Sequence, residues 1–510
     1  MVNVFSYRTP FMGLVSCCVA TQVYAVESMR VQQEETPNVV FIYADDMGRG
    51  MLSYFGQHII STPNIDRVFK EGTSFEYAYG CMYSAPARGS LLTGYNDCRN
   101  GLWNISNGGM MQTANTEEKL DSIERIINKS RVELPKGDLF LPQVFKQAGY
   151  VTGQYGKLDW GFSATRQQVR EHGWDHYCGY LDHQRAHFFY PGFLFENDSI
   201  VHIKENTHPT GGRGFEDETP ENYKKRWDMT GKVVYSQDFL LGRMLSFIRK
   251  HQNEKFFLYH STQLPHGPVA IPAVHPSVKD RTDLSEIEKE YASMVLKLDE
   301  HVGIILDELE KLKILDKTMI VFSVDNGHET YYTTGNRCVK NKDTEKRNFD
   351  AWDYPYRSDR TGDPFDGNNG MSGKKWMNWE GSVRVPLAFR WPGHIPANQV
   401  SKQVVSNYDL LTTFADMLNV KLTTKKDGET IMPILTGGKK ELDHERYVFV
   451  KSPEGPAVIS SDHWKLRYNK KLNKYRLHYL PDDYKEEKFL NDQYPDILNK
   501  LKDKLAPYID

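Results

Sequence analysis

The sequence predicts an α/β fold in which one sheet is covered by helices on both faces. Short continuous apolar runs read as buried strands, and four of them lie at residues 38–44, 150–155, 256–259 and 319–324. Helical patterns lie between these runs, and such alternation places helices on both sides of a sheet. The chain has 510 residues, whereas a single core stops growing at about 250–300 residues, so a second, smaller domain is expected.

Two helices between the predicted strands have clear limits. Residues 141–148 form one helical pattern, which Gly149 ends. A longer pattern at residues 285–312 presents an apolar face made of Met294, Leu298, Val302 and Ile305.

Polar clusters follow each of the four predicted strands. They are Asp45-Asp46, Gly156-Lys157-Leu158-Asp159, Pro265-His266-Gly267-Pro268 and Asp325-Asn326-Gly327. One such cluster is ordinary turn chemistry, because carboxylates often cap helices or form turns. Ligands in open α/β sheets, however, bind beyond the carboxyl ends of the strands. Four clusters at four strand ends therefore predict one shared site.

The segment Ser84-Ala-Pro-Ala-Arg88-Gly-Ser-Leu-Leu-Thr-Gly94 carries the strongest chemical signal. Ser84 suits a helix N-cap, and Gly94 suits the end of that helix. A spacing of four places Arg88 one turn along on the same face, beside the positive end of the helix dipole. Capping alone explains Ser84, but a nucleophile there would also be flanked by a cation and free N–H groups, as an anionic substrate requires.

The charge of the chain excludes one class of partner, and its N-terminus predicts export. A formal net charge of −3 argues against nucleic acid, which usually needs a basic face. Residues 1–25 read as an export signal, with Arg8 before a mainly apolar stretch that is too short to span a membrane. Two endings stay open. One is a signal-peptidase site at Ala25, and the other is a lipoprotein box that would attach a lipid to Cys17.

The cysteines that follow this segment fit neither a zinc site nor a dense disulfide framework, because their spacing is wide and irregular. One or two bridges at most are expected among Cys81, Cys98, Cys178 and Cys338.

With these motifs the chain resembles the formylglycine-dependent sulfatases, a serine-type, arylsulfatase-like branch of the alkaline phosphatase superfamily. Their signature is Cys or Ser followed by x-Pro-x-Arg and then Leu-Thr-Gly, which the segment from Ser84 to Gly94 matches. A second match is Lys375-Trp-Met-Asn-Trp-Glu380-Gly-Ser-Val-Arg-Val-Pro386. The resemblance runs from about Pro37 to the C-terminus.

The resemblance implies the architecture in more detail. It implies an alkaline phosphatase-like fold, with a large mixed sheet sandwiched by helices and a smaller C-terminal α+β subdomain. The catalytic domain would span residues 37–395 and the subdomain residues 396–510.

The resemblance also implies a metal site made of Asp45, Asp46, Asp325 and Asn326. All four side chains offer only oxygen ligands, which independently favours Ca²⁺ or Mg²⁺ over zinc.

The reaction that the resemblance implies is hydrolysis of a sulfate ester. Ser84 would be oxidised to formylglycine (3-oxoalanine), whose hydrate attacks sulfur with help from the metal and Arg88. Lys157 would hold sulfate oxygens, and His266 with Lys375 would protonate the leaving alcohol.

The serine form of the signature resembles that of bacterial enzymes matured by a radical enzyme. A bacterial source is therefore expected, with the protein in the periplasm or as an outer-membrane lipoprotein that faces the periplasm or the cell surface. Membrane contact would come only through a lipid on Cys17.

One position departs from the family pattern. Sulfatases commonly carry Lys-x-His where this chain has Lys157-Leu-Asp159. Asp159 is expected either to take over as a base, because a carboxylate near a metal and two lysines stays ionised, or to accept a structural hydrogen bond.

Two segments after catalytic strand ends predict a sulfated saccharide as substrate. Residues 172–197 interleave aromatics with His183, Arg185 and His187, and residues 329–369 carry Arg357, Arg360 and Asp363. Aromatic rings suit the apolar faces of sugars, while His, Arg and Asp suit hydroxyls and anionic groups. By analogy with relatives that have similar His-rich segments, galactose or N-acetylgalactosamine is the favoured sugar.

Two other functions stay open at this point. One is hydrolysis of phosphate mono- or diesters by an unmodified Ser84, as elsewhere in the superfamily. The other is glycan binding without catalysis, with Asp159 as the trace of lost activity.

Overall fold

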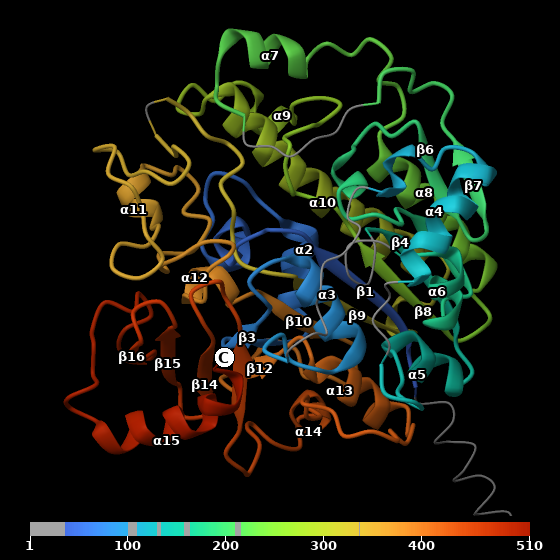
Figure 1. Ribbon diagram of the computed structural model, residues 1–510. Helices are drawn as coiled ribbons and strands as arrows, with labels where there is room; N and C mark the ends of the chain where they lie inside the picture. The colour runs from blue at the N-terminus through green and yellow to red at the C-terminus, as the bar shows by residue number, and fades with distance from the viewer. Residues whose placement is uncertain are drawn as a thin grey trace, which may run out of the picture. The chain divides into compact units, whose positions relative to one another are not determined.

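The central sheet is mixed and has ten strands in the part of the chain that the structure describes (Figure 1). The structure, a computed structural model, describes residues 36–99, 110–129, 134–157, 164–209, 216–335 and 337–509. Residues 38–510 form one unit, treated below; the predicted signal segment, including Cys17, lies outside the described residues. The strand order is β11 (Gln399–Ser401), β2 (Thr73–Phe75), β10 (Leu387–Arg390), β9 (Thr318–Val324), β1 (Asn38–Ala44), β8 (Phe256–Ser261), β4 (Val151–Gly156), β5 (His176–Gly179), β6 (Phe193–Glu196) and β7 (Ser199–His202).

The strands that carry the predicted polar clusters lie side by side in the middle of this sheet. β9, β1, β8 and β4 are neighbours in that order, and each pairs in parallel with the next. Antiparallel strands flank them, β10 beside β9 and β6 beyond β5. All four predicted strands are confirmed, and their carboxyl ends meet at one edge of the sheet.

Helices cover both faces of the sheet. α2 (Pro63–Lys70), α8 (Ser236–Lys250) and α10 (Glu286–Lys311) pack together, as do α3 (Ser84–Thr93), α5 (Leu141–Gln147) and α13 (Asp409–Met417). Successive residues of β8 separate the two groups. Phe256 contacts Phe247 of α8, and Phe257 stacks on Phe145 of α5 at 4.0 Å. Because side chains alternate across a strand, the two groups lie on opposite faces, as expected.

Local signals set the limits of these helices within one residue of the prediction. At the start of α10 the amide of Ser285 donates to Glu288 Oε2 at 2.8 Å, which is one half of a capping box. α3 ends at Gly94, whose φ of 72° belongs to the left-handed region that glycine adopts without strain. The other α-helices are α4 (Glu117–Lys129), α6 (Arg166–Glu171), α7 (Pro220–Arg226), α9 (Pro276–Lys279), α11 (Ser358–Thr361), α12 (Glu380–Val383), α14 (Met432–Leu435) and α15 (Pro495–Leu505).

A separate four-stranded antiparallel sheet follows near the C-terminus, drawn in red in Figure 1. It consists of β13 (Tyr447–Val450), β14 (Ala457–Ser460), β15 (Trp464–Asn469) and β16 (Lys474–Tyr479), and α15 packs on β14 and β15. This sheet with its helix is the expected α+β subdomain.

A two-stranded sheet and a buried ion cluster join further segments that are far apart in the sequence. β12 (Val405–Ser406) pairs with β3 (Ala78–Tyr79), just before helix α3. Lys465 of β15 lies between Glu380, at 2.9 Å, and Glu486, at 3.1 Å, and all three side chains are inaccessible to water. β11 and α13 also pack with central elements, while the predicted boundary after residue 395 stays a prediction.

Two further observations bear on the sequence predictions. Within the described ranges no helix is both long and apolar enough to cross a membrane. The cysteines that were considered for disulfides are free, buried thiols: Cys81, Cys98, Cys178 and Cys338.

Candidate active site

The predicted polar residues meet at the carboxyl edge of the central strands. Asp45 and Asp46 follow β1, Asp325 and Asn326 follow β9, and Lys157 follows β4. All five are fully buried. Their convergence follows from the parallel pairing of the three strands with β8 between β1 and β4.

Three carboxylates and three cations alternate in this centre. Lys157 Nζ donates to Asp45 Oδ2, and Lys375 Nζ donates to Asp46 Oδ2 at 2.7 Å. The third cation, the guanidinium of Arg88, donates to Asp325 Oδ2 at 3.2 Å and lies 3.6 Å from Asp45. The opposite charges balance, so these groups can be buried together.

Ser84 points into the same centre. Its Oγ donates to Asp45 Oδ1 at 2.6 Å and lies 3.3 Å from Lys157 Nζ. Tyr83, rather than Ser84, occupies the N-cap position of α3, so the expected capping by Ser84 is replaced by this contact. Arg88 lies one turn along the helix, as predicted, and also donates to Ser261 Oγ.

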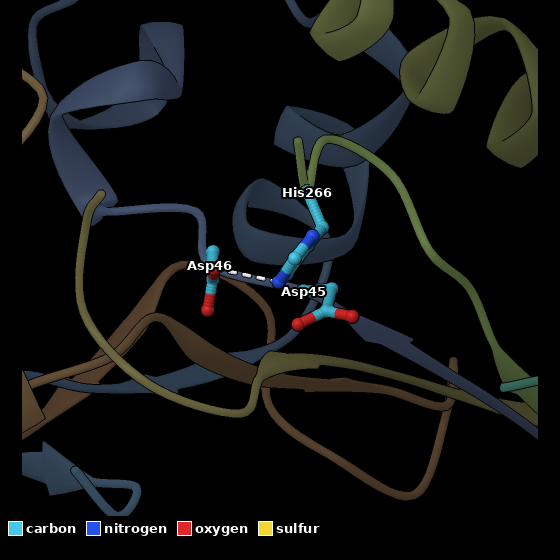
Figure 2. A group of neighbouring side chains, drawn as sticks. All are labelled: Asp45, Asp46 and His266. Carbon is cyan, nitrogen blue, oxygen red and sulfur yellow. Dashed lines mark ion pairs between the residues drawn. The ribbon is translucent and has the colours of Figure 1, made fainter. Parts of the chain in front are cut away.

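Oxygen ligands for a cation gather beside Ser84. Asp45, Asp46 and His266 each place one ligand atom within 4.8 Å of the others, and Figure 2 shows the imidazole ring directed at the two carboxylates. Asn326 Nδ2 donates to Asp46 Oδ1 at 2.8 Å, while Asn326 Oδ1 is buried without a hydrogen-bond partner among the described residues. Asp325 Oδ1 accepts from the Asp46 amide at 3.0 Å.

The electrostatics of the centre differ from one carboxylate to the next. Burial, followed by the negative charge of Asp45, raises the pKa of Asp325 to about 7. Burial also raises the pKa of Asp45, but the surrounding positive charges, that of Lys157 first, outweigh it and hold that pKa well below its ordinary value. Burial lowers the pKa of Lys157, although the negative charge of Asp45 opposes this shift.

His266 and Lys375 form a pair over Asp46. Lys375 Nζ lies 3.2 Å from His266 Nε2, and His266 Nδ1 lies 2.5 Å from the carbonyl of Gly267. Burial and the charge of Lys375 hold the pKa of His266 well below its ordinary value. Burial opposes the charge on Lys375, but Asp46 and Asp45 outweigh it and raise the pKa of Lys375. The pair is therefore a neutral imidazole that accepts from an ammonium group.

The His-rich segment lies against this pair. His187, at the end of a 3-10 helix (Arg185–His187), stacks on His266 at 4.3 Å with the rings only 7° from parallel. His183 meets His187 edge to face at 5.7 Å. Both ring nitrogens of His187 are buried and have no hydrogen-bond partner among the described residues. Arg185 is directed elsewhere, donating to the carbonyl of Phe193 at 2.6 Å.

The second predicted substrate segment has other contacts. Arg357 pairs with Asp359 and Glu487, and Arg360 donates to the carbonyl of Pro355 at 2.9 Å. Asp363 is buried and accepts from Tyr332, Tyr356 and Ser358 and from backbone amides, so it organises its own loop. Whether Arg357, Arg360 and Asp363 bind substrate stays a prediction. Asp159 lies outside the described residues, and its role also stays a prediction.

Two residues of the centre were not predicted from the sequence. Tyr331 donates to Asp46 Oδ2, and its ring lies 5.0 Å from that of His266. Ser261, the last residue of β8, accepts from Arg88. The position of Ser261 beside a polar strand end was a usable signal. Tyr331 lies within the predicted substrate segment 329–369, but no motif there marks its contact with Asp46.

Known proteins share this organisation. The family model for sulfatases matches residues 37–420, and the model for the C-terminal part of N-sulphoglucosamine sulphohydrolase matches residues 367–509. The chain is 28% identical over 411 residues to N-acetylgalactosamine-6-sulfatase of Homo sapiens, covering 79% of this chain and 67% of that protein. It is 25% identical over 482 residues to N-acetylgalactosamine-6-O-sulfatase of Bacteroides thetaiotaomicron, covering 85% and 83%.

Solved structures show the same fold. A structure described under the metabolism of multiple glycosaminoglycans by Bacteroides thetaiotaomicron superposes with a TM-score of 0.67 at 20% identity, covering 93% of this chain and 99% of that one. Members of this family use formylglycine and a divalent metal, and here the signature serine lies beside a buried Asp-Asp-His cluster. Because the family match spans most of its length, the chain belongs to the sulfatase family of the alkaline phosphatase superfamily and is a sulfuric ester hydrolase.

Proposed function

We propose that this sulfatase removes sulfate from glycans of the galactose or N-acetylgalactosamine type, using a formylglycine made from Ser84 beside a calcium ion. The observation that carries the proposal is the contact of Ser84 Oγ with Asp45, at 2.6 Å, inside a centre of balanced charges. The names of the two N-acetylgalactosamine-6-sulfatases among the relatives support the sugar class.

The nucleophile would come from Ser84. A sulfatase-maturing radical enzyme would oxidise the side chain to an aldehyde, whose hydrate supplies the attacking hydroxyl group. Asp45 accepts from the hydroxyl at this position and would orient it, while Lys157 keeps positive charge 3.3 Å away. Without the modification, an unmodified Ser84 is the starting point of the rival phosphate-ester reaction.

The residues around Ser84 fit a hard divalent cation. Asp45, Asp46, Asp325 and Asn326 would hold it through oxygens, and the amide oxygen of Asn326 is buried without a partner among the described residues. Zinc prefers nitrogen and sulfur ligands, so this donor set favours Ca²⁺, or Mg²⁺ in its place. A bound cation would polarise a sulfate oxygen and the nucleophile.

The cations of the centre would bind the sulfate group. Arg88, Lys157 and Lys375 balance the three carboxylates, so a divalent metal would leave a net positive charge. A sulfate ester carries one negative charge and would offset part of this positive charge, which favours its binding over that of a neutral ester.

His266 and Lys375 would deliver a proton to the leaving alcohol. Lys375 carries the proton and donates toward His266 Nε2 at 3.2 Å. An alkoxide of a sugar is a poor leaving group, so a positioned acid lowers the barrier to its departure. Asp159 remains a candidate base for the later release of sulfate.

The stacked histidines would contact the sugar. His187 has two buried ring nitrogens without partners among the described residues, and a sugar hydroxyl can satisfy one as donor and the other as acceptor. His183 and Arg185 precede it in the same segment, and Arg357, Arg360 and Asp363 remain candidates from the second predicted segment. The proposed location is the periplasm, or the outer membrane through a lipid on Cys17 with the enzyme facing the periplasm or the cell surface.

One panel of substrates tests the proposal together with the mass of the Ser84 peptide. The panel contains sulfated galactose, N-acetylgalactosamine and glucosamine, an aryl sulfate and a phosphodiester. We expect the highest kcat/KM on the first two sugars and a Ser84 peptide that is lighter than the encoded one by two hydrogens. Ser84→Ala should lower turnover by more than about a thousandfold.

Each other outcome rejects a defined part of the proposal. Fully active enzyme with an intact serine would exclude the formylglycine mechanism. A preference for aryl sulfates or phosphodiesters would exclude glycans as the substrate class, and a preference for glucosamine would exclude only the sugar type.

A further inference from the structure

Trp376 is a large aromatic residue that the fold leaves half exposed next to the reaction centre. Its side chain keeps 47% of its accessible surface, although it directly follows Lys375, which contacts Asp46 and His266. The indole ring centre lies 5.8 Å from Lys375 Nζ. An apolar surface close to the ammonium group of Lys375 is therefore exposed to solvent.

The backbone of Trp376 is strained, although the side chain is only half buried. Its φ of 80° lies in the left-handed region, which is unfavourable for a residue with a bulky side chain. The conformation is fixed by its neighbours, since the Trp376 amide donates to Met82 at 2.8 Å and the Lys375 amide donates to His328 at 3.0 Å. Glycine adopts this φ freely, so stability alone does not explain a tryptophan here.

Tyr83 holds the indole in place. The two rings stack with centroids 4.4 Å apart and planes 24° from parallel. Tyr83 is itself buried and is the N-cap residue directly before Ser84. The stacked pair therefore joins the residue before the nucleophile to the residue after the proton donor, and it leaves part of the indole accessible.

We propose that Trp376, supported by Tyr83, is a platform on which the apolar face of the sulfated sugar ring packs. This inference rests on the proposed function and names a specificity-determining residue for it. A sugar whose sulfate reaches Lys375 can place its ring against the indole, because the indole centre lies only 5.8 Å from Lys375 Nζ. The C–H face of a sugar matches an exposed aromatic face, whereas water does not.

Three variants distinguish the contribution of the aromatic ring from that of the backbone strain. Trp376→Ala removes the platform and should raise KM for the preferred sulfated saccharide about tenfold, with kcat little changed, because the lost contact is made in ground and transition states alike. Trp376→Phe keeps an aromatic face and should retain most of the affinity. Trp376→Gly removes the strain with the ring, so it should melt at a higher temperature than Trp376→Ala yet show the same high KM.

Two controls locate the effect. The inhibition constant of inorganic sulfate reports the sulfate pocket alone and should stay the same in all three variants. Phe489→Ala removes another aromatic side chain of similar exposure, 51%, from the C-terminal subdomain and should leave KM unchanged.

The possible failures differ from one another. If the wild type hydrolyses the saccharide and Trp376→Ala has the same KM, the platform is refuted while the proposed function stands. It is also refuted if the inhibition constant of sulfate rises with KM, or if Trp376→Gly restores KM, because either result assigns the effect to the shape of the site. A wild type that hydrolyses an aryl sulfate but no saccharide sulfate overturns the proposed function and the platform with it.

Discussion

Asp45 illustrates how one side chain connects the two parts of the reaction centre. Its Oδ1 accepts from Ser84 and its Oδ2 accepts from Lys157, so it contacts both the proposed nucleophile and a cation proposed to bind sulfate. The cations around it keep it ionised, which leaves it able to serve as a metal ligand as well. Removing this one carboxylate would therefore disturb the orientation of the nucleophile, the binding of the metal and the binding of the anion together.

The pairing of His266 with Lys375 leads to a prediction that depends on the leaving group. His266→Ala should lower kcat on a saccharide sulfate by roughly 10²–10⁴-fold, because a sugar alkoxide needs a proton as it departs. The same variant should lose far less on 4-nitrophenyl sulfate, whose phenolate leaves without one. Steady-state kinetics on both substrates measure the difference, and equal losses would assign His266 a role in binding instead.

At the scale of single elements, helix α2 is capped by another helix. The N-cap residue Thr62 makes no side-chain bond to the amides of the first turn. Instead, Asp299 of α10 accepts from the amides of Asn64 and Ile65 at 3.0 and 2.8 Å. Because helix amides at the first turn have no partner within the helix, this carboxylate satisfies donors that would otherwise be buried unpaired.

We therefore expect Asp299→Ala to lower the free energy of unfolding by about 1–3 kcal/mol. Asp299→Asn retains an acceptor and should lose less. Urea denaturation followed by circular dichroism measures both, with Asp307→Ala as the control because Asp307 is exposed on the same helix. Equal midpoints for Asp299→Ala and the control would show that the amides of α2 are satisfied in another way.

The elements themselves were largely predictable from the sequence, since each has a local cause. The strand at residues 38–44 is a continuous apolar run, and Gly94 and Gly149 end helices with the left-handed φ that glycine permits. The cap from Asp299 was not predictable, because it comes from a residue 235 positions away from Asn64. The role of Tyr331 was not predicted for the same reason, since its contact with Asp46 spans 285 positions.

At the scale of the whole molecule, the sheet brings distant parts of the chain to one point. Lys375 reaches Asp46 across 329 positions, and Arg88 reaches Asp325 across 237. The four predicted metal ligands follow two adjacent strands, β1 and β9, so the strand order alone was enough to place them together. The sequence could not reveal which cation faces which carboxylate, because that depends on side-chain packing.

Calcium should consequently stabilise the whole fold. A cation that binds only the folded state adds about 2.7 kcal/mol at a concentration one hundred times its dissociation constant. We expect the melting temperature to fall on treatment with a chelator and to recover with added Ca²⁺, as measured by differential scanning fluorimetry. The Asp325→Ala variant serves as the control and should not respond. Identical melting of the wild type with and without Ca²⁺ would contradict a metal at this site.

The burial of Ser84 has a consequence for the life history of the protein. Every residue of helix α3 is buried, and Ser84 exposes no surface at all. If a maturing enzyme oxidises Ser84, we expect it to act on the chain before the helix and the sheet have formed around this side chain. Protein that folds before this oxidation should then remain an unmodified, inactive precursor.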